Sequence, residues 1–212
     1  MVIAIDGPAG AGKSTVARAL AERLDFTYLD SGAMYRCVAL SAVRAGVDPD
    51  DGETVAALAR GLELEMTDED VLLGGESVRE AIREEAVSAA ASRVSVHPEV
   101  REAMVGQQRG LVADGRWVAE GRDIGTVVCP DAPLKVFLTA SERERARRRA
   151  EQTGREVEAV LTEQRDRDRR DRDRAHGALK PAADSVEVDT DGLGIDQVID
   201  RIADLARERE LL

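Results

Sequence analysis

The chain has 212 residues, 43% of them hydrophobic, with one Trp, two Tyr and two Phe, and a formal net charge of −12. This length is typical of one compact domain with an insertion, whose core must be filled by Ala, Val, Leu and Ile. The negative charge argues against general binding to nucleic acid, whose phosphates it would repel. Because no run of 18 apolar residues and no leader-like segment occurs, we expect a cytoplasmic protein without a membrane span.

The first 45 residues predict a βαβ unit. A short apolar strand over Val2–Asp6 ends at Gly7-Pro8, and a helix over Ser14–Leu24 follows with one apolar stripe. A strand at Thr27–Leu29 and a helix from about Ala33 to Arg44 complete the unit. This order and spacing imply a parallel sheet.

The next segment has a different pattern. Leu62–Val78 alternates apolar and acidic residues around Gly74-Gly75, which predicts a small antiparallel ribbon inserted into the parallel domain. Helical sequence then runs from about Arg79 to Val94, breaks at His97-Pro98 and continues to about Leu111.

The C-terminal half returns to strands and helices. Trp117–Glu120, Leu134–Leu138 and Val186–Val188 are predicted strands, and Ile195–Arg207 is a predicted closing helix. Two arginine-rich segments, at 143–149 and 165–174, lie between them.

A phosphate-binding loop is the most specific motif. The run from Gly7 to Ser14 matches G-x-x-x-x-G-K-[ST], with a strand before it and a helix after it. Its backbone N–H groups can surround a polyphosphate, Lys13 can reach the β and γ phosphates, and the Ser14 hydroxyl can bind Mg²⁺. The predicted ATP-binding residues of this loop are Gly7, Pro8, Ala9, Gly10, Ala11, Gly12, Lys13, Ser14 and Thr15.

The type of P-loop protein follows from what the sequence lacks. It has no Asn-Lys-x-Asp guanine motif, as a GTPase would, and it is small for an oligomeric ATPase. A kinase of a small molecule is therefore the favoured class.

Two strand ends offer arginines to an acceptor. Arg36 follows the second strand and can form bidentate hydrogen bonds with a phosphate, while Asp30 or Ser31 can bind sugar or phosphate. The alternative is a helix cap with a surface arginine. Arg122 and Asp123 follow another strand and should face the same cleft, or else form a local ion pair.

The arginine-rich segments allow two interpretations. On a helix Arg167, Asp171 and Arg174 share one face, which suits either an anion site or a solvated surface with ion pairs. Arg145 and Arg149 are like charges one turn apart, as are residues 143 and 147, and an arriving polyanion would relieve their repulsion. This favours a mobile lid over ATP, with Gly154 as a hinge.

With these residues in view, the chain resembles the bacterial cytidylate kinases of the nucleoside monophosphate kinase superfamily. The resemblance covers nearly the whole chain and rests on the P-loop, Leu29–Arg36, Gly121–Val128, Pro130–Pro133, Arg167–Arg174 and Pro181–Asp184. It implies an α/β fold of the P-loop NTPase type, with a five-stranded parallel sheet flanked by helices. It also implies a core (1–45, 111–140 and 184–212), a monophosphate-binding insert at about 46–110, a lid at about 141–165 and an acceptor-binding helix at about 165–175.

The resemblance also assigns roles. Lys13, Arg36, Arg122 and Arg167 would be catalytic, the three arginines holding the phosphate of CMP. The implied CMP-binding set is Asp30, Ser31, Tyr35, Arg36, Ser92, Arg101, Arg122, Asp123, Arg167, Asp171 and Arg174, with Ser92, Arg101 and Asp123 facing the cytosine. Arg145 and Arg149 would bind ATP.

The expected reaction transfers the γ-phosphate of Mg²⁺-bound ATP to CMP or dCMP in a monomer. Glu120 stands where the family commonly has Asp, and it could act on the metal through water. The alternatives are a kinase for another acceptor, such as UMP, and an inactive nucleotide-binding regulator.

Overall fold

The computed structural model describes residues 1–67 and 70–212. They form two compact units: unit 1 contains residues 1–28 and 114–212, and unit 2 contains residues 29–113. None of the helices in these described ranges combines the length and apolar character needed to cross a bilayer.

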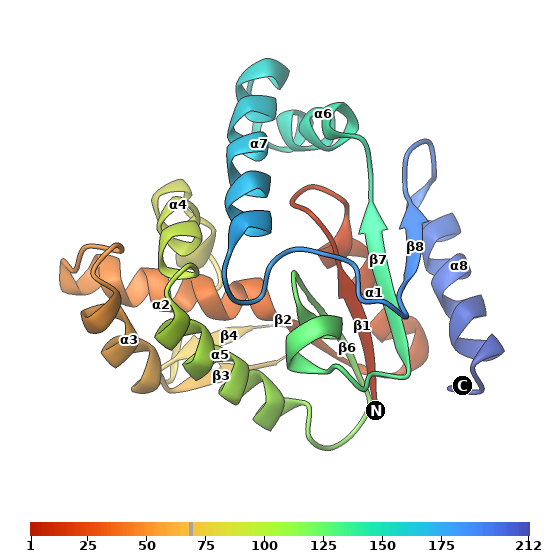
Figure 1. Ribbon diagram of the computed structural model, residues 1–212, viewed down its shortest axis with the longest axis horizontal. Helices are drawn as coiled ribbons and strands as arrows, with labels where there is room; N and C mark the ends of the chain where they lie inside the picture. Colours follow the sequence, from red (N-terminus) through yellow and green to blue (C-terminus); the bar gives the residue numbers. More distant parts are fainter. Residues whose placement is uncertain (68–69) are drawn as a thin grey trace. The chain divides into compact units, whose positions relative to one another are not determined.

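A five-stranded sheet confirms the predicted parallel α/β fold. Its order is β2-β6-β1-β7-β8, so the strand that precedes the P-loop is central (Figure 1). The strands are β2 (Thr27–Asp30), β6 (Trp117–Gly121), β1 (Val2–Asp6), β7 (Leu134–Thr139) and β8 (Val186–Asp189). Asp6 is in register with Gly121 on one side and Phe137 on the other, which brings the three carboxyl ends together.

The core of unit 1 is aliphatic, as the composition predicts. α1 (Lys13–Leu24) and α8 (Ile195–Glu208) pack on each other and on this sheet (Figure 1). Ile3 and Ile5 of β1 are fully buried with Leu20 of α1 and Ile202 of α8. Burial of such side chains typically contributes about 1.5–3 kcal/mol each, and it fixes β1 and α1 as the rigid base of the P-loop.

Unit 1 also contains two charged helices and a short π-helical turn. α6 (Glu142–Thr153) ends at Gly154, whose φ of 66° closes the helix, and α7 (Val157–Asp173) follows. The two helices share a small apolar cluster of Ala146, Ala150, Val160 and Leu161. Residue 165, where the sequence divides lid from acceptor helix, lies inside α7. The π turn η2 (Ile124–Val128) follows β6.

Unit 2 is mostly helical. Its elements are α2 (Ser31–Ala45), α3 (Gly52–Arg60), β3 (Leu64–Met66), β4 (Val71–Leu73), β5 (Glu76–Ser77), η1 (Ala81–Arg83), α4 (Glu85–Val94) and α5 (Pro98–Leu111). The predicted antiparallel ribbon is confirmed as the sheet β3-β4-β5. Helix α3 was not predicted, although Asp51 caps it by accepting from the Thr54 amide.

Candidate active site

The P-loop connects β1 to α1 in a conformation that requires glycine. Gly7 has a φ of 151°, and a Cβ there would lie 2.1 Å from the carbonyl oxygen of Leu138 in β7. Gly10 has a φ of 81°, and a Cβ there would lie 2.9 Å from Nε2 of Gln164 in α7. The loop is therefore packed closely against β7 and α7, and substitution at either glycine would displace it.

Lys13 is the first residue of α1 and its side chain is buried. Its Nζ donates to the carbonyl oxygen of Pro8 at 2.9 Å. The pKa of Lys13 falls to about 7, because burial disfavours the ammonium and the cations of Arg122 and Arg167 repel it. These two predicted arginines thus act electrostatically at the P-loop lysine, and a bound polyphosphate would offset all three charges.

A hydroxyl and a carboxylate meet beside the loop. Ser14 Oγ donates to Oε1 of Glu120 at 2.5 Å, and the Tyr28 hydroxyl donates to the same oxygen at 3.1 Å. Glu120 is buried near the carboxyl end of β6. Tyr28 was not among the residues predicted from sequence, because a tyrosine in a strand normally indicates packing.

The donor set fits a magnesium ion that arrives with nucleotide. Within residues 1–67 and 70–212 no group of three or more His, Cys, Asp or Glu side chains could hold a metal ion. Mg²⁺ typically uses one or two protein oxygens, with waters and substrate phosphates as its other ligands. Ser14 and Glu120 are suited to this role.

Asp6 orients the turn that follows β6. Its carboxylate accepts from the amides of Ile124 at 2.8 Å and Gly125 at 2.7 Å. The pKa of Asp6 is raised to about 6, mainly by burial and also by the nearby charge of Asp123. The two backbone hydrogen bonds and Lys13 lower this pKa but do not outweigh burial. Asp6 is the last residue of β1 and directly precedes the P-loop. This position is the feature of the sequence that could have indicated its role.

Arg122 is held by a buried carboxylate from α7. Its Nε donates to Oδ2 of Asp171 at 2.9 Å, and Arg174 pairs with the other oxygen of Asp171. Burial alone would raise the pKa of Asp171, but Arg122, Arg174 and Arg167 outweigh it and hold the pKa below its usual range. The structure therefore groups Arg122, Arg167, Asp171 and Arg174 within unit 1. Asp123, the residue after Arg122, is buried.

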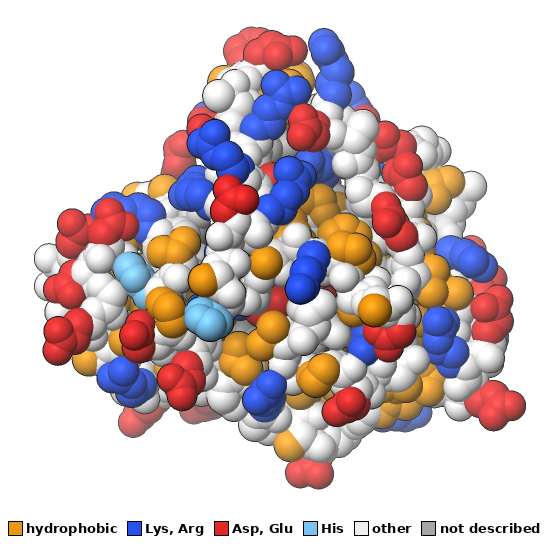
Figure 2. Space-filling model, in the orientation of Figure 1, with side chains coloured by type: hydrophobic (Ala, Val, Ile, Leu, Met, Phe, Trp, Pro, Cys, Tyr) orange, Lys and Arg blue, Asp and Glu red, His pale blue; other side chains and the backbone are white. Residues whose placement is uncertain are grey.

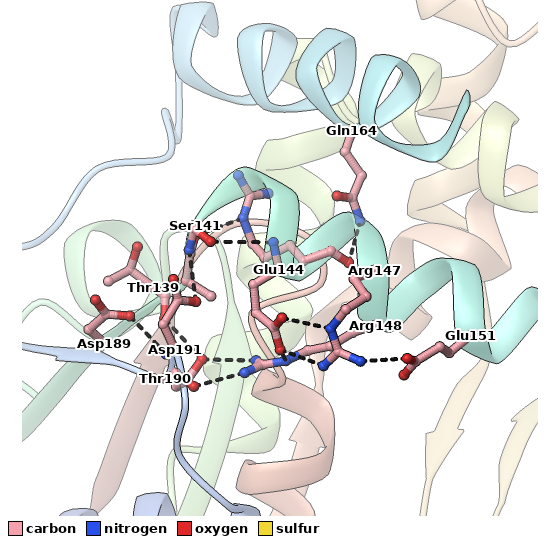
Figure 3. Close-up of polar contacts among 12 residues, drawn as sticks. Thr139, Ser141, Glu144, Arg147, Arg148, Glu151, Gln164, Asp189, Thr190 and Asp191 are labelled. Atoms are coloured by element: carbon pink, nitrogen blue, oxygen red, sulfur yellow. Dashed lines mark hydrogen bonds and ion pairs between the residues drawn. The ribbon is translucent and has the colours of Figure 1, made fainter. Parts of the chain in front are cut away.

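The two arginines assigned to ATP on α6 differ in environment. Arg145 is buried, donating to Ala9 O of the P-loop at 3.0 Å and pairing with Asp168 of α7 at 2.7 Å. Arg149 is exposed. Arg147 and Arg148 both pair with Glu144, and Arg148 also donates to the hydroxyl of Thr190 (Figure 3). The repulsion expected between the arginines of α6 is thus offset by nearby carboxylates. Basic side chains also gather on the surface over α7 (Figure 2).

Three predicted residues of unit 2 lie at the start of α2. Asp30 caps this helix by accepting from the Ala33 amide at 2.8 Å, and its other oxygen pairs with Arg36 at 2.8 Å. Ser31 is buried beside this pair. Asp30 therefore caps the helix, as one of the two interpretations expects, and the same carboxylate also orients Arg36. Nε of Arg36 is buried without a hydrogen-bond partner among the described residues.

The remaining predicted residues of unit 2 lie on α2, α4 and α5. The Arg101 guanidinium lies 5.5 Å from the ring centre of Tyr35, a cation–π contact. Ser92 is buried, and its hydroxyl has no partner within the described ranges. A buried hydroxyl such as that of Ser92 is suited to a ligand's polar atoms.

Solved structures share the fold at low sequence identity. A gluconokinase from Sinorhizobium meliloti 1021 matches with a TM-score of 0.55 and 18% identity, over 99% of this chain and 93% of that chain. A shikimate kinase from Bacteroides thetaiotaomicron matches with a TM-score of 0.51 and 16% identity, over 98% of both chains. These likenesses support the fold alone.

Sequence comparisons are much closer. The chain is 51% identical to a cytidylate kinase from Rhodococcus jostii over 99% of this chain and 96% of that protein. It is 45% identical to one from Syntrophotalea carbinolica over 99% and 93%. The family model described as Cytidylate kinase matches residues 3–208. With the P-loop and the partly buried arginine cluster in place, the chain belongs to the cytidylate kinase family.

Proposed function

We propose that this protein transfers the γ-phosphate of ATP to CMP or dCMP, giving ADP and CDP or dCDP. One observation carries the proposal beyond family membership: Asp6, which precedes the P-loop, is in register with Gly121, which precedes Arg122, so the loop and this arginine follow neighbouring strand ends. The electrostatic effect of Arg122 and Arg167 on Lys13 agrees with this proximity. A phosphate loop and acceptor-side cations placed in this way suit two phosphate groups brought together for reaction.

The chemistry needs positioning and charge rather than a strong base. The acceptor phosphate is already ionised at neutral pH, so its oxygen can attack in line. Lys13 would stabilise the β and γ phosphates, and Arg36, Arg122 and Arg167 would hold the acceptor phosphate. Asp171 keeps Arg122 in place through the 2.9 Å contact. Such preorganised cations offset the charge that spreads over the transferred group.

Magnesium would be held by the Ser14 hydroxyl and, through water, by Glu120. When bound with ATP, it supplies charge neutralisation of the phosphate oxygens. The residues of this chain do the remaining work, since the P-loop amides and Lys13 orient the triphosphate.

The nucleoside of the acceptor would be recognised by Ser92, Arg101 and Asp123. Cytosine carries an N4 amino donor and the N3 and O2 acceptors, which suit a carboxylate together with hydroxyl or guanidinium donors. Asp30, Ser31, Tyr35, Asp171 and Arg174 complete the proposed CMP-binding set. The segment 46–110 would be the monophosphate-binding insert, and 141–165 the lid that excludes water, with Arg145 and Arg149 on the ATP side. The protein would act as a monomer.

The test is a coupled assay of the purified protein with ATP and a panel of acceptors: CMP, dCMP, UMP, AMP and shikimate. We expect turnover with CMP or dCMP well above that with the others. Turnover of UMP alone would replace the proposed acceptor, and ATP binding without turnover of any acceptor would indicate an inactive regulator.

A further inference from the structure

Tyr28 occupies an unusual place for a core aromatic residue. It lies in β2 with its side chain buried, and the guanidinium of Arg18 in α1 lies 4.6 Å from its ring centre. The hydroxyl points at a carboxylate oxygen of β6, Oε1 of Glu120, at 3.1 Å. A packing role would be served equally well by phenylalanine, so the hydroxyl needs a separate explanation.

The oxygen that Tyr28 contacts also accepts the hydroxyl hydrogen of Ser14, at 2.5 Å. Ser14 and Glu120 are the two groups that fit Mg²⁺. If the Ser14 oxygen faced a metal, its hydrogen bond to Glu120 would weaken, and the glutamate side chain has three rotatable bonds about which it could turn. The phenol is on a rigid strand, so it can keep the carboxylate oriented toward Ser14.

We propose that Tyr28 is a positioning residue of the metal site, which holds Glu120 so that it faces the magnesium bound with nucleotide. Arg18 would assist by fixing the plane of the ring through its cation–π contact. This inference depends on the proposed function, because it takes Ser14 and Glu120 as the residues that hold the metal.

The inference separates two properties of nucleotide binding. Metal-free ADP would be held by the P-loop amides and Lys13, whereas the Tyr28 hydroxyl donates to Glu120. The additional affinity that Mg²⁺ gives to ADP depends on Ser14 and Glu120. Tyr28→Phe should therefore weaken the binding of Mg-ADP and leave that of metal-free ADP unchanged.

The experiment is calorimetric titration of ADP, once with Mg²⁺ and once with EDTA, for four proteins: wild type, Y28F, E120Q and Y28F/E120Q. The measured quantity is the ratio of the two dissociation constants. We expect Y28F to reduce the gain from Mg²⁺ by about 10-fold, the lower end of typical effects of residues that orient metal ligands. E120Q should reduce it at least as much, and Y28F should add nothing to E120Q, because the phenol then has no carboxylate to orient.

A nearby ring provides the matched control. Phe26 is buried two residues earlier, with the Arg116 guanidinium 4.9 Å from its ring centre, but it has no hydroxyl. Phe26→Leu should lower the melting temperature and leave the Mg²⁺ ratio unchanged. If F26L shifts the ratio as much as Y28F does, the effect is packing and the inference is overturned.

The outcomes distinguish this inference from the proposed function. A normal ratio in Y28F with a reduced ratio in E120Q would overturn the role of Tyr28 alone. A normal ratio in both would remove Glu120 from the metal site, and with it this inference, while phosphate transfer to CMP would still be decided by the acceptor panel.

Discussion

Arg122 is a proposed acceptor-side residue whose side chain is held in place by a buried carboxylate. Its Nε donates to the buried Asp171 and its Nη1 to the carbonyl oxygen of Gly121 at 3.3 Å, so the guanidinium is already oriented and a ligand would cost it little side-chain entropy. We expect Arg122→Ala to lower kcat/KM for CMP by roughly 100-fold or more, since a charge-assisted contact to phosphate is lost. The affinity for ADP, measured by calorimetry, should change little.

Arg169, exposed on the same helix as Asp171, supplies the control for that measurement. R169A removes the same charge from the protein and leaves the contacts of Asp171 intact. It should have the wild-type kcat/KM for CMP and the wild-type affinity for ADP. Equal losses for CMP and ADP in R122A would show that Arg122 does not belong to the acceptor side.

Asp171 predicts a pH-dependent stability. Its pKa is held below the usual range by Arg122, Arg174 and Arg167, against the effect of burial. A carboxylate with a depressed folded-state pKa stabilises the protein above its unfolded pKa, and this contribution is lost as pH falls through the folded value. Asp171→Asn should therefore cost about 3 kcal/mol at neutral pH, because a buried guanidinium loses its partner. The difference from wild type should shrink below about pH 4.

Urea denaturation at a series of pH values measures this difference. Asp173, exposed two residues further along α7, gives the comparison variant D173N, which should follow the wild-type curve. A D171N deficit that persists undiminished at low pH would show that the amide disturbs packing rather than an ionic contact.

Among elements, α6 carries one side chain, Arg145, that contacts both the P-loop and α7. The Nε of Arg145 donates to Ala140 O at 3.1 Å, and its Nη1 contacts both Ala9 O and Asp168. Lysine has one donor group and cannot reproduce this fork. We expect Arg145→Lys to destabilise the protein by about 2–4 kcal/mol and to weaken ADP binding, because the P-loop loses its contact at Ala9.

Arg147, exposed on the same helix and paired with Glu144 and Glu151, is the matched position. R147K should change the unfolding free energy by less than about 0.5 kcal/mol, as surface ion pairs contribute little. Replacing both buried partners, as in R145M/D168M, should recover part of the loss because neither charge is left unpaired. An R145K as mild as R147K would contradict the proposed anchoring.

The elements that the sequence predicts well are those with strong periodicity. The β1–α1–β2–α2 unit, the antiparallel ribbon, the break at Pro98 and the closing helix α8 all agree with their predicted ranges within a few residues. Helix α3 was missed because it is only nine residues long and its apolar face consists of Val55, Ala56 and Ala59. The π turn η2 could not be predicted, because Asp6, 118 residues away, supplies the acceptor for its first amide.

The same distinction applies to the site. The placement of the P-loop and Arg122 at neighbouring strand ends could be predicted because strand ends in a parallel sheet meet at one edge. Two contacts at the site could not be predicted: that of Tyr28 with Glu120, 92 residues further along the chain, and that of Arg145 with Asp168 on the next helix. No local pattern distinguishes such a tyrosine or aspartate from its neighbours, and only the fold brings the partners together.

For the whole molecule, the decisive feature is where the two sets of predicted ligand-binding residues fall. The ATP set is confined to unit 1, whereas the CMP set includes residues of unit 1, such as Arg122, and residues of unit 2, such as Arg36.

Hydrogen exchange with mass spectrometry should reveal this difference between the two predicted sets directly. We expect ADP to protect amides of residues 7–15, and CMP added afterwards to protect 121–125 and 167–174 together with 30–36 and 92–101. Arg36→Ala should retain the ADP protection and lose the protection by CMP in unit 2, whereas CMP protection limited to unit 1 in the wild type would exclude Arg36, Ser92 and Arg101 from the acceptor site.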